Sequence, residues 1–132
     1  MPIPSFVPTL VICASISAVS AQAAVTEDNF LVKNAGDLVE LCSAEPSDPL
    51  YTAARHFCEG FAVGAYRVLE EENGARAPSH RLFCPPNPAP TRDKGIASFV
   101  QWARADASRL ALGPADGVFA FLSSQYPCPA GR

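Results

Sequence analysis

Hydrophobic residues recur at helical spacing in four segments of the chain, of which the central one is the longest. This segment opens at Asp48 and Pro49, residue types typical of a helix start, and closes at Asn73 and Gly74, which are typical of a helix end. Within it, apolar side chains return at steps of three and four and share one helix face: Tyr51, Ala54, Cys58, Phe61, Ala65 and Val68. We therefore predict a long helix whose Cys58 side chain points into the core.

Two glycines of this predicted helix, Gly60 and Gly64, lie four residues apart beside the apolar face. Residues at this spacing are neighbours on a helix surface, so the pair leaves a flat strip there. Because glycine has no side chain, a second helix can approach such a strip closely. We predict close helix packing at Gly60 and Gly64.

Three shorter segments show the same helical period. The first begins at Asn34 and ends near Ser43, with Leu38, Leu41 and Cys42 on its inner face. The second follows Thr91 and carries an apolar stripe of Ile96, Phe99, Val100, Ala103, Ala107 and Leu110. The third starts at Gly113 and ends near Cys128, with Ala115, Val118, Phe119 and Leu122 facing inward. No stretch alternates as a strand would, so the sequence predicts an all-α fold, a compact bundle of about four helices.

Two connecting segments lack a helical pattern. Residues 24–33 mix polar and apolar types, and we expect a loose arm there. The proline-rich segment 85–90 cannot continue a helix and should run extended in polyproline-like form. It is either a stiff connector or a rigid protruding loop for insertion into a partner, and we favour the connector.

The N-terminus has the pattern of an export signal. Residues 6–19 form an apolar run that is too short to cross a bilayer as a stable helix, although residues 1–5 carry no Lys or Arg. Ala21-Gln22-Ala23 supplies the small-x-small pattern that signal peptidase accepts. We predict a signal peptide over residues 1–23, a mature domain over residues 24–132 and a periplasmic location. A transmembrane anchor is the alternative, and we expect no stable membrane anchor.

Cysteine usage agrees with export. Of the five cysteines, Cys13 lies in the predicted signal, which leaves Cys42, Cys58, Cys84 and Cys128. An even number in a short exported chain predicts two disulfides and an oxidising compartment. Each bridge contributes about 2–4 kcal/mol to a domain of this size.

Composition and charge exclude several function classes. With 132 residues, 48% of them hydrophobic, the chain suits one domain, and its net charge of −3 argues against a nucleic-acid partner. His56 and Cys58 lie two apart on a helix, about 200° from each other, and cannot form a catalytic pair. A zinc site from His80, Cys84 and Cys58 is conceivable but lacks paired Cys-x-x-Cys spacing. We predict no enzyme activity, no metal and no cofactor.

Three consecutive acidic residues, Glu70, Glu71 and Glu72, stand near the end of the central helix. Carboxylates there oppose the helix dipole and cost a few tenths of a kcal/mol each. They are either a solvated helix end or an acidic patch that captures a basic protein partner. The third possibility is that neighbouring basic residues of the same chain neutralise the three acids: Arg76, His80 and Arg81. We keep the three glutamates as candidate partner-binding residues.

Four motifs in order carry a resemblance to a known family. They are Asn34-Ala35-Gly36-Asp37-Leu38-Val39-Glu40-Leu41-Cys42, Phe57-Cys58-Glu59-Gly60-Phe61-Ala62-Val63-Gly64, Phe83-Cys84-Pro85-Pro86 and Gln125-Tyr126-Pro127-Cys128. Together they resemble the Rap1a/Tai family of small periplasmic immunity proteins over residues 34–128. The chain departs from the pattern after the proline run, where Lys94 stands for the usual Gln and a His-Pro break is missing.

The resemblance implies a helical, disulfide-bonded and often dimeric domain. It further implies a protein that binds a peptidoglycan-amidase toxin delivered by type VI secretion and blocks its active site. No toxin-contact residue is carried over from the family. The alternative is a general envelope assembly or stress protein that shares the fold without a toxin partner.

Four cysteines allow three pairings. A helix hairpin would place Cys42 near the start of the central helix, about ten residues short of Cys58. The loop that carries Cys84 folds back over the central helix more easily. We therefore prefer Cys58–Cys84 with Cys42–Cys128.

Overall fold

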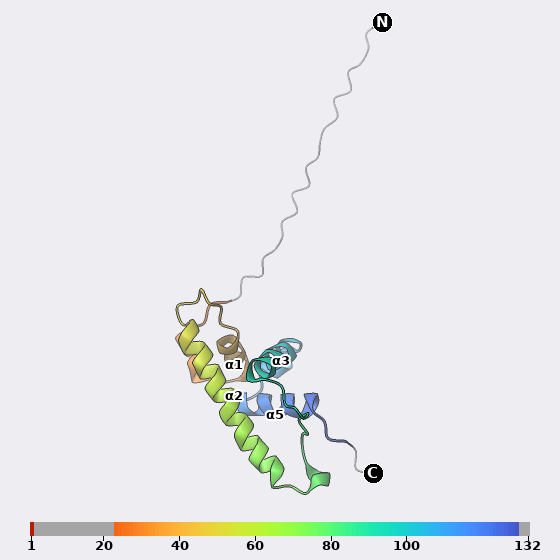
Figure 1. Ribbon diagram of the computed structural model, residues 1–132. Helices are drawn as coiled ribbons and strands as arrows, with labels where there is room; N and C mark the ends of the chain where they lie inside the picture. Colours follow the sequence, from red (N-terminus) through yellow and green to blue (C-terminus); the bar gives the residue numbers. More distant parts are fainter. Residues whose placement is uncertain (2–22, 130–132) are drawn as a thin grey trace.

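The computed structural model describes Met1 and residues 23–129, and this part of the chain is helical without strands (Figure 1). Its elements in order are η1 (Glu27–Leu31), α1 (Ala35–Cys42), α2 (Tyr51–Gly74), η2 (Pro78–His80), α3 (Arg92–Arg104), α4 (Ala107–Leu110) and α5 (Pro114–Gln125), where η denotes a 3-10 helix. The all-α prediction is confirmed. Most of the predicted signal peptide, with Cys13, lies outside the described residues. None of the described helices is long and apolar enough to cross a membrane.

Helix α1 lies at the centre of the core, although it is short. Its side chains Ala35, Leu38, Val39 and Leu41 are each at most 1% exposed, because α1 contacts α2, α3 and α5. Figure 1 shows α1 and α3 beside the first half of α2, with α5 crossing near the middle of that long helix. The second half of α2 extends past the bundle toward η2.

The residues that open two of the predicted helices, Asn34 and Thr91, act as N-caps. The Asn34 side chain accepts a hydrogen bond from the Asp37 N–H (2.9 Å), and the Thr91 hydroxyl accepts one from the Lys94 N–H (3.4 Å). Asp48 acts differently from a simple cap. Its carboxylate accepts from the N–H groups of Leu50 (2.7 Å) and Val25 (2.8 Å), so it joins the N-terminal segment to the start of α2.

The second predicted stripe is divided between two helices. Helix α3 ends at Arg104, and Asp106 then caps the short helix α4. The Asp106 carboxylate accepts from both the Ser108 hydroxyl (2.7 Å) and the Ser108 N–H (2.9 Å), and these bonds hold the pKa of Asp106 below its ordinary value. An Asp that bonds its own downstream backbone favours a new helix start over continuation of the old helix.

The predicted loose arm is ordered. It forms η1, whose Asn29 side chain donates to Asp37 in α1 (3.0 Å). Phe30 of the same turn meets Phe57 of α2 edge to face, with ring centroids 5.7 Å apart. The proline-rich segment 85–90 contains no helix, as predicted.

The predicted packing role of Gly60 and Gly64 is wrong. Both glycines are exposed, and a Cβ added at either would meet no atom within 4 Å. Val68, predicted on the inner face, is 59% exposed. The close helix approach occurs instead at Gly117 of α5, where an added Cβ would lie 2.9 Å from Ala35 Cβ in α1. The face of α2 that carries its glycines points to solvent because α1, α3 and α5 all pack elsewhere.

The preferred disulfide pairing is also wrong. The bridges are Cys42–Cys58, with Cα atoms 5.1 Å apart, and Cys84–Cys128, with Cα atoms 4.8 Å apart. The prediction assumed a tight hairpin, but residues 43–50 form a wider connection that lets the C-terminus of α1 meet the third turn of α2. Arg55 marks the same crossing, since its guanidinium donates to the Cys42 carbonyl (3.0 Å). Two disulfides are therefore present as predicted, but with exchanged partners.

Candidate partner-binding groove

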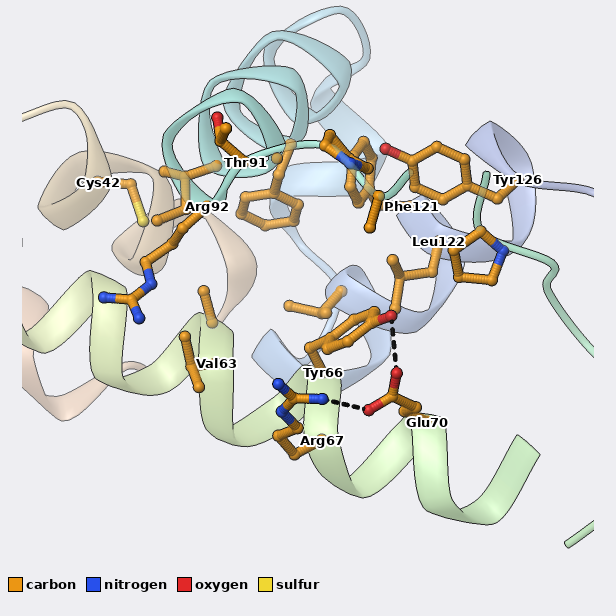
Figure 2. Close-up of a pocket in the computed structure, with 18 of the residues that line it drawn as sticks. Cys42, Val63, Tyr66, Arg67, Glu70, Thr91, Arg92, Phe121, Leu122 and Tyr126 are labelled. Atoms are coloured by element: carbon orange, nitrogen blue, oxygen red, sulfur yellow. Dashed lines mark hydrogen bonds and ion pairs between the residues drawn. The ribbon is translucent and has the colours of Figure 1, made fainter. Parts of the chain in front are cut away.

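An open apolar groove of about 430 Å³ lies between α2 on one side and α3, α5 and the proline-rich segment on the other (Figure 2). This volume is in the range of sites that bind ligands in proteins. Six side chains from three helices form its floor: Leu38, Ile96, Phe99, Val118, Phe121 and Leu122. The groove is the main candidate site among the residues that the structure describes, and the sequence did not reveal it.

Small and rigid residues keep the groove open. Ala62 lines the α2 wall, and Gly95 lines the α3 wall, where an added Cβ would meet no atom within 4 Å. The proline-rich segment forms a third wall. It is held at one end by the Cys84–Cys128 disulfide and by the Cys84 N–H, which donates to the Tyr126 carbonyl (2.7 Å). The groove therefore depends on the second disulfide for one of its walls.

Three polar side chains of α2 form a network at the groove edge. The Arg67 guanidinium donates to Glu70 (2.6 Å), and the Tyr66 hydroxyl donates to the same carboxylate (3.1 Å), as Figure 2 shows. The Arg67 bond lowers the pKa of Glu70 and raises the pKa of Arg67. Partial burial and the bond to Glu70 raise the pKa of Tyr66. At neutral pH the edge therefore carries one fixed ion pair and a neutral phenol.

A second charged group stands farther toward the start of α2. Glu59 pairs with Arg55 in the same helix (3.4 Å) and with Arg92 at the start of α3 (3.7 Å). Asp93 lies 3.7 Å from Arg55 but is 82% exposed, so this last pair contributes little to stability. Opposite charges alternate here, and the groove edge has no strong excess of either sign.

The three predicted partner-binding glutamates do not form one patch. Glu70 lines the groove and is paired with Arg67, whereas Glu71 is exposed. Glu72 lines a separate, smaller hollow of about 260 Å³ between the end of α2 and the start of α5, together with Asp116. Within residues 23–129 no ion pair joins these glutamates to the basic residues of the following loop. Their role in partner binding stays a prediction.

Asn73 is a structural residue that sequence analysis treated only as a helix end. It is 7% exposed, its side-chain oxygen accepts from the Leu82 N–H (2.7 Å), and its side-chain amide donates to the Phe83 carbonyl (2.8 Å). These bonds hold the segment before Cys84 against the end of α2. Asn73 lies on the same side of the helix as Cys58. The sequence could have indicated its role, because a polar residue on a buried helix face needs a hydrogen-bond partner.

The zinc alternative is excluded by the disulfides. Cys58 and Cys84 are both oxidised in separate bridges, so neither offers a thiolate ligand. In the part of the chain that the structure describes, no group of three His, Cys, Asp or Glu side chains has the arrangement of a metal site.

The fold and the groove define a class of protein: a small, disulfide-stapled helical domain with an open apolar groove on its surface. The chain belongs to the Rap1a immunity protein family, whose family model matches residues 34–128. The resemblance noted in the sequence is thereby confirmed. Comparisons with curated proteins and with solved structures give no significant match. Family membership implies an immunity role against a toxin, exercised by binding, in a family that is generally non-enzymatic.

Proposed function

We propose that this protein is exported to the periplasm, where it binds and blocks a peptidoglycan amidase delivered by type VI secretion. The observation that carries the proposal is the family match over residues 34–128, which covers every helix from α1 to α5 and all four disulfide cysteines. Both disulfides are consistent with an oxidising compartment, and the apolar run of residues 6–19 supports export.

A stapled scaffold suits inhibition by binding. Two disulfides and a core centred on α1 restrict the motion of the surfaces that α2, α3 and α5 present. A preformed surface loses little conformational entropy on association, which favours tight binding. The inhibitor needs no catalytic residue for this role, since occupation of the toxin's active site is sufficient.

A protection assay in the periplasm tests the proposal. Bacteria that export a type VI amidase encoded in the same gene neighbourhood should lyse, and co-expression of the full chain should restore growth. A variant without residues 2–23 should accumulate in the cytoplasm and fail to protect. Lysis that continues although the exported, folded protein is present would refute the proposed function.

We also propose that the protein forms a homodimer through the outer face of α2. Four residues at helical spacing form an exposed strip there: Phe57, Gly60, Gly64 and Val68. The two glycines leave room for close approach of a second α2 helix, and Phe57 is 36% exposed. The double substitution of Phe57 and Val68 by Asp should give a monomer in light scattering, and a wild-type protein that is already monomeric would contradict the dimer.

A further inference from the structure

The floor of the groove is the edge of the hydrophobic core, where the core borders solvent. Phe99, Val118 and Phe121 are only 4–7% exposed, and their remaining accessible surface faces the groove. Protein interiors are close-packed, and side chains beside an open hollow lose dispersion contacts on that side. A bulky apolar group that entered the groove would recover those contacts and leave water at the same time.

The edge of the groove combines this apolar floor with exposed arginines. Arg67 is 67% exposed and Arg92 is 58% exposed, although each forms one ion pair with α2, to Glu70 and Glu59 respectively. Eight residues separate Glu59 from Arg67, which corresponds to about 12 Å along the helix. A guanidinium has five N–H donors, and one ion pair does not use them all. Two cationic donor groups therefore flank the apolar opening along α2.

An apolar centre with arginine and tyrosine at its margin is the usual anatomy of a protein interface. We propose that the groove is the anchor site for the toxin: it receives one bulky aromatic or branched aliphatic side chain from a toxin segment. Arg67 and Arg92 bind carboxylate or carbonyl oxygens of the residues on either side of that anchor. This inference rests on the proposed immunity function and adds the surface and the chemistry by which the toxin is recognised.

The groove borders the proposed dimer face. Tyr66 and Glu70 face the groove, whereas Gly60 and Gly64 belong to the exposed strip. Arg67 also lines the groove three residues after Gly64, so the two surfaces are neighbours on α2. The alternative occupants of the groove are a second copy of this chain and a small apolar molecule. The experiment below distinguishes each of them from the toxin.

The test fills the groove without disturbing the core. Gly95→Leu places a side chain in the open space beside α3, and Ala62→Phe fills the groove from the α2 wall. Gly74→Leu is the control, because Gly74, like Gly95, is helical and free of neighbours within 4 Å of an added Cβ but lies outside the groove. Titration calorimetry measures binding to the purified amidase that the protein neutralises in the protection assay.

We expect Gly95→Leu and Ala62→Phe to raise Kd by about 30-fold or more, as loss of an anchor contact does. Arg67→Ala and Arg92→Ala should each raise Kd by roughly 3-fold to 10-fold, because they lie at the rim. Gly74→Leu should leave Kd unchanged. The melting temperature of each variant verifies that it is folded, and Gly95→Leu should melt at or above the wild-type temperature.

Three results would overturn the anchor site while the immunity function survives. The first is wild-type affinity in both groove-filling variants. The second is loss of self-association in these variants with amidase binding intact, which would assign the groove to a second copy. The third is a small apolar molecule that co-purifies with the wild type in native mass spectrometry and is absent from Gly95→Leu, again with amidase binding intact. A wild-type protein that neither protects nor binds would refute the function itself and the anchor site with it.

Discussion

At the scale of single residues, buried polar groups and close backbone contacts determine where the helices and loops meet. Asn73 holds the segment before Cys84, and Gly117 lets α5 touch α1. Neither role follows from residue type alone. An asparagine before a glycine at the end of a helix usually terminates that helix. A glycine inside a helix can serve close packing, a helix end or a functional site, so its residue type does not identify its role.

Asn73→Ala should destabilise the protein by about 1–3 kcal/mol, because the Leu82 N–H loses its partner and the Phe83 carbonyl loses its partner in a buried position. Urea unfolding measures the change. Gln101→Ala, on the exposed face of α3, is the control and should have little effect. Equal stability of the two variants would show that the Asn73 bonds do not hold the loop.

Gly117→Leu should cost roughly 1–3 kcal/mol of stability through overpacking against Ala35. In the monomeric Phe57→Asp, Val68→Asp background, Gly60→Ala should instead stabilise by about 0.5–1 kcal/mol, since the new methyl group meets open space in an exposed helix position. Thermal unfolding of both variants compares the two glycines directly. A destabilising Gly60→Ala would restore the packing role that the sequence suggested for this residue.

Glu70 provides a pH-dependent prediction. Its pKa in the folded protein lies below the ordinary value because of the Arg67 bond. The pair therefore adds stability above the ordinary glutamate pKa of about 4.3, and this stability is lost as the pH falls through the lower folded value. In an NMR titration, Arg67→Gln should raise the Glu70 pKa, whereas Arg76→Gln should not. An unchanged Glu70 pKa in Arg67→Gln would contradict this assignment.

At the scale of elements, the helices were predictable and their crossings were not. Caps and the apolar period are local signals: Asn34 and Thr91 correctly placed the starts of α1 and α3, and the apolar period placed α2 and α5. The disulfide partners depend on the path of residues 43–50, for which the sequence contains no periodic signal. The groove was equally unpredictable from the sequence, because its walls come from α2, α3, α5 and a loop, which are distant from one another along the chain.

The two disulfides should differ in their response to reductant. Cys42 and Cys58 are 6% and 0% exposed, whereas Cys84 and Cys128 are partly exposed. Limited reduction of the folded protein should therefore open Cys84–Cys128 first, because a thiolate needs access to a sulfur atom. Alkylation of the freed thiols followed by peptide mapping identifies the opened bridge. Preferential labelling of Cys42 and Cys58, or a peptide that joins Cys58 to Cys84, would contradict the described arrangement.

At the scale of the whole molecule, α2 contributes to two neighbouring surfaces with different chemistry. One is the groove with its apolar floor and arginine edge, and the other is the exposed strip around Gly60 and Gly64. Both disulfides support this division, since one joins α2 to α1 and the other holds the proline-rich wall. The immunity role was visible in the sequence through its family motifs, but the proposed anchor site required the three-dimensional arrangement.

The most direct measurement is the hydrolysis of purified peptidoglycan by the amidase as the oxidised protein is added. We predict that hydrolysis falls in proportion to the added protein and stops when one binding site per amidase is filled. Protein that has been fully reduced and unfolded should not inhibit. Undiminished hydrolysis in the presence of excess folded, oxidised protein would contradict the claim that this chain is an amidase immunity protein.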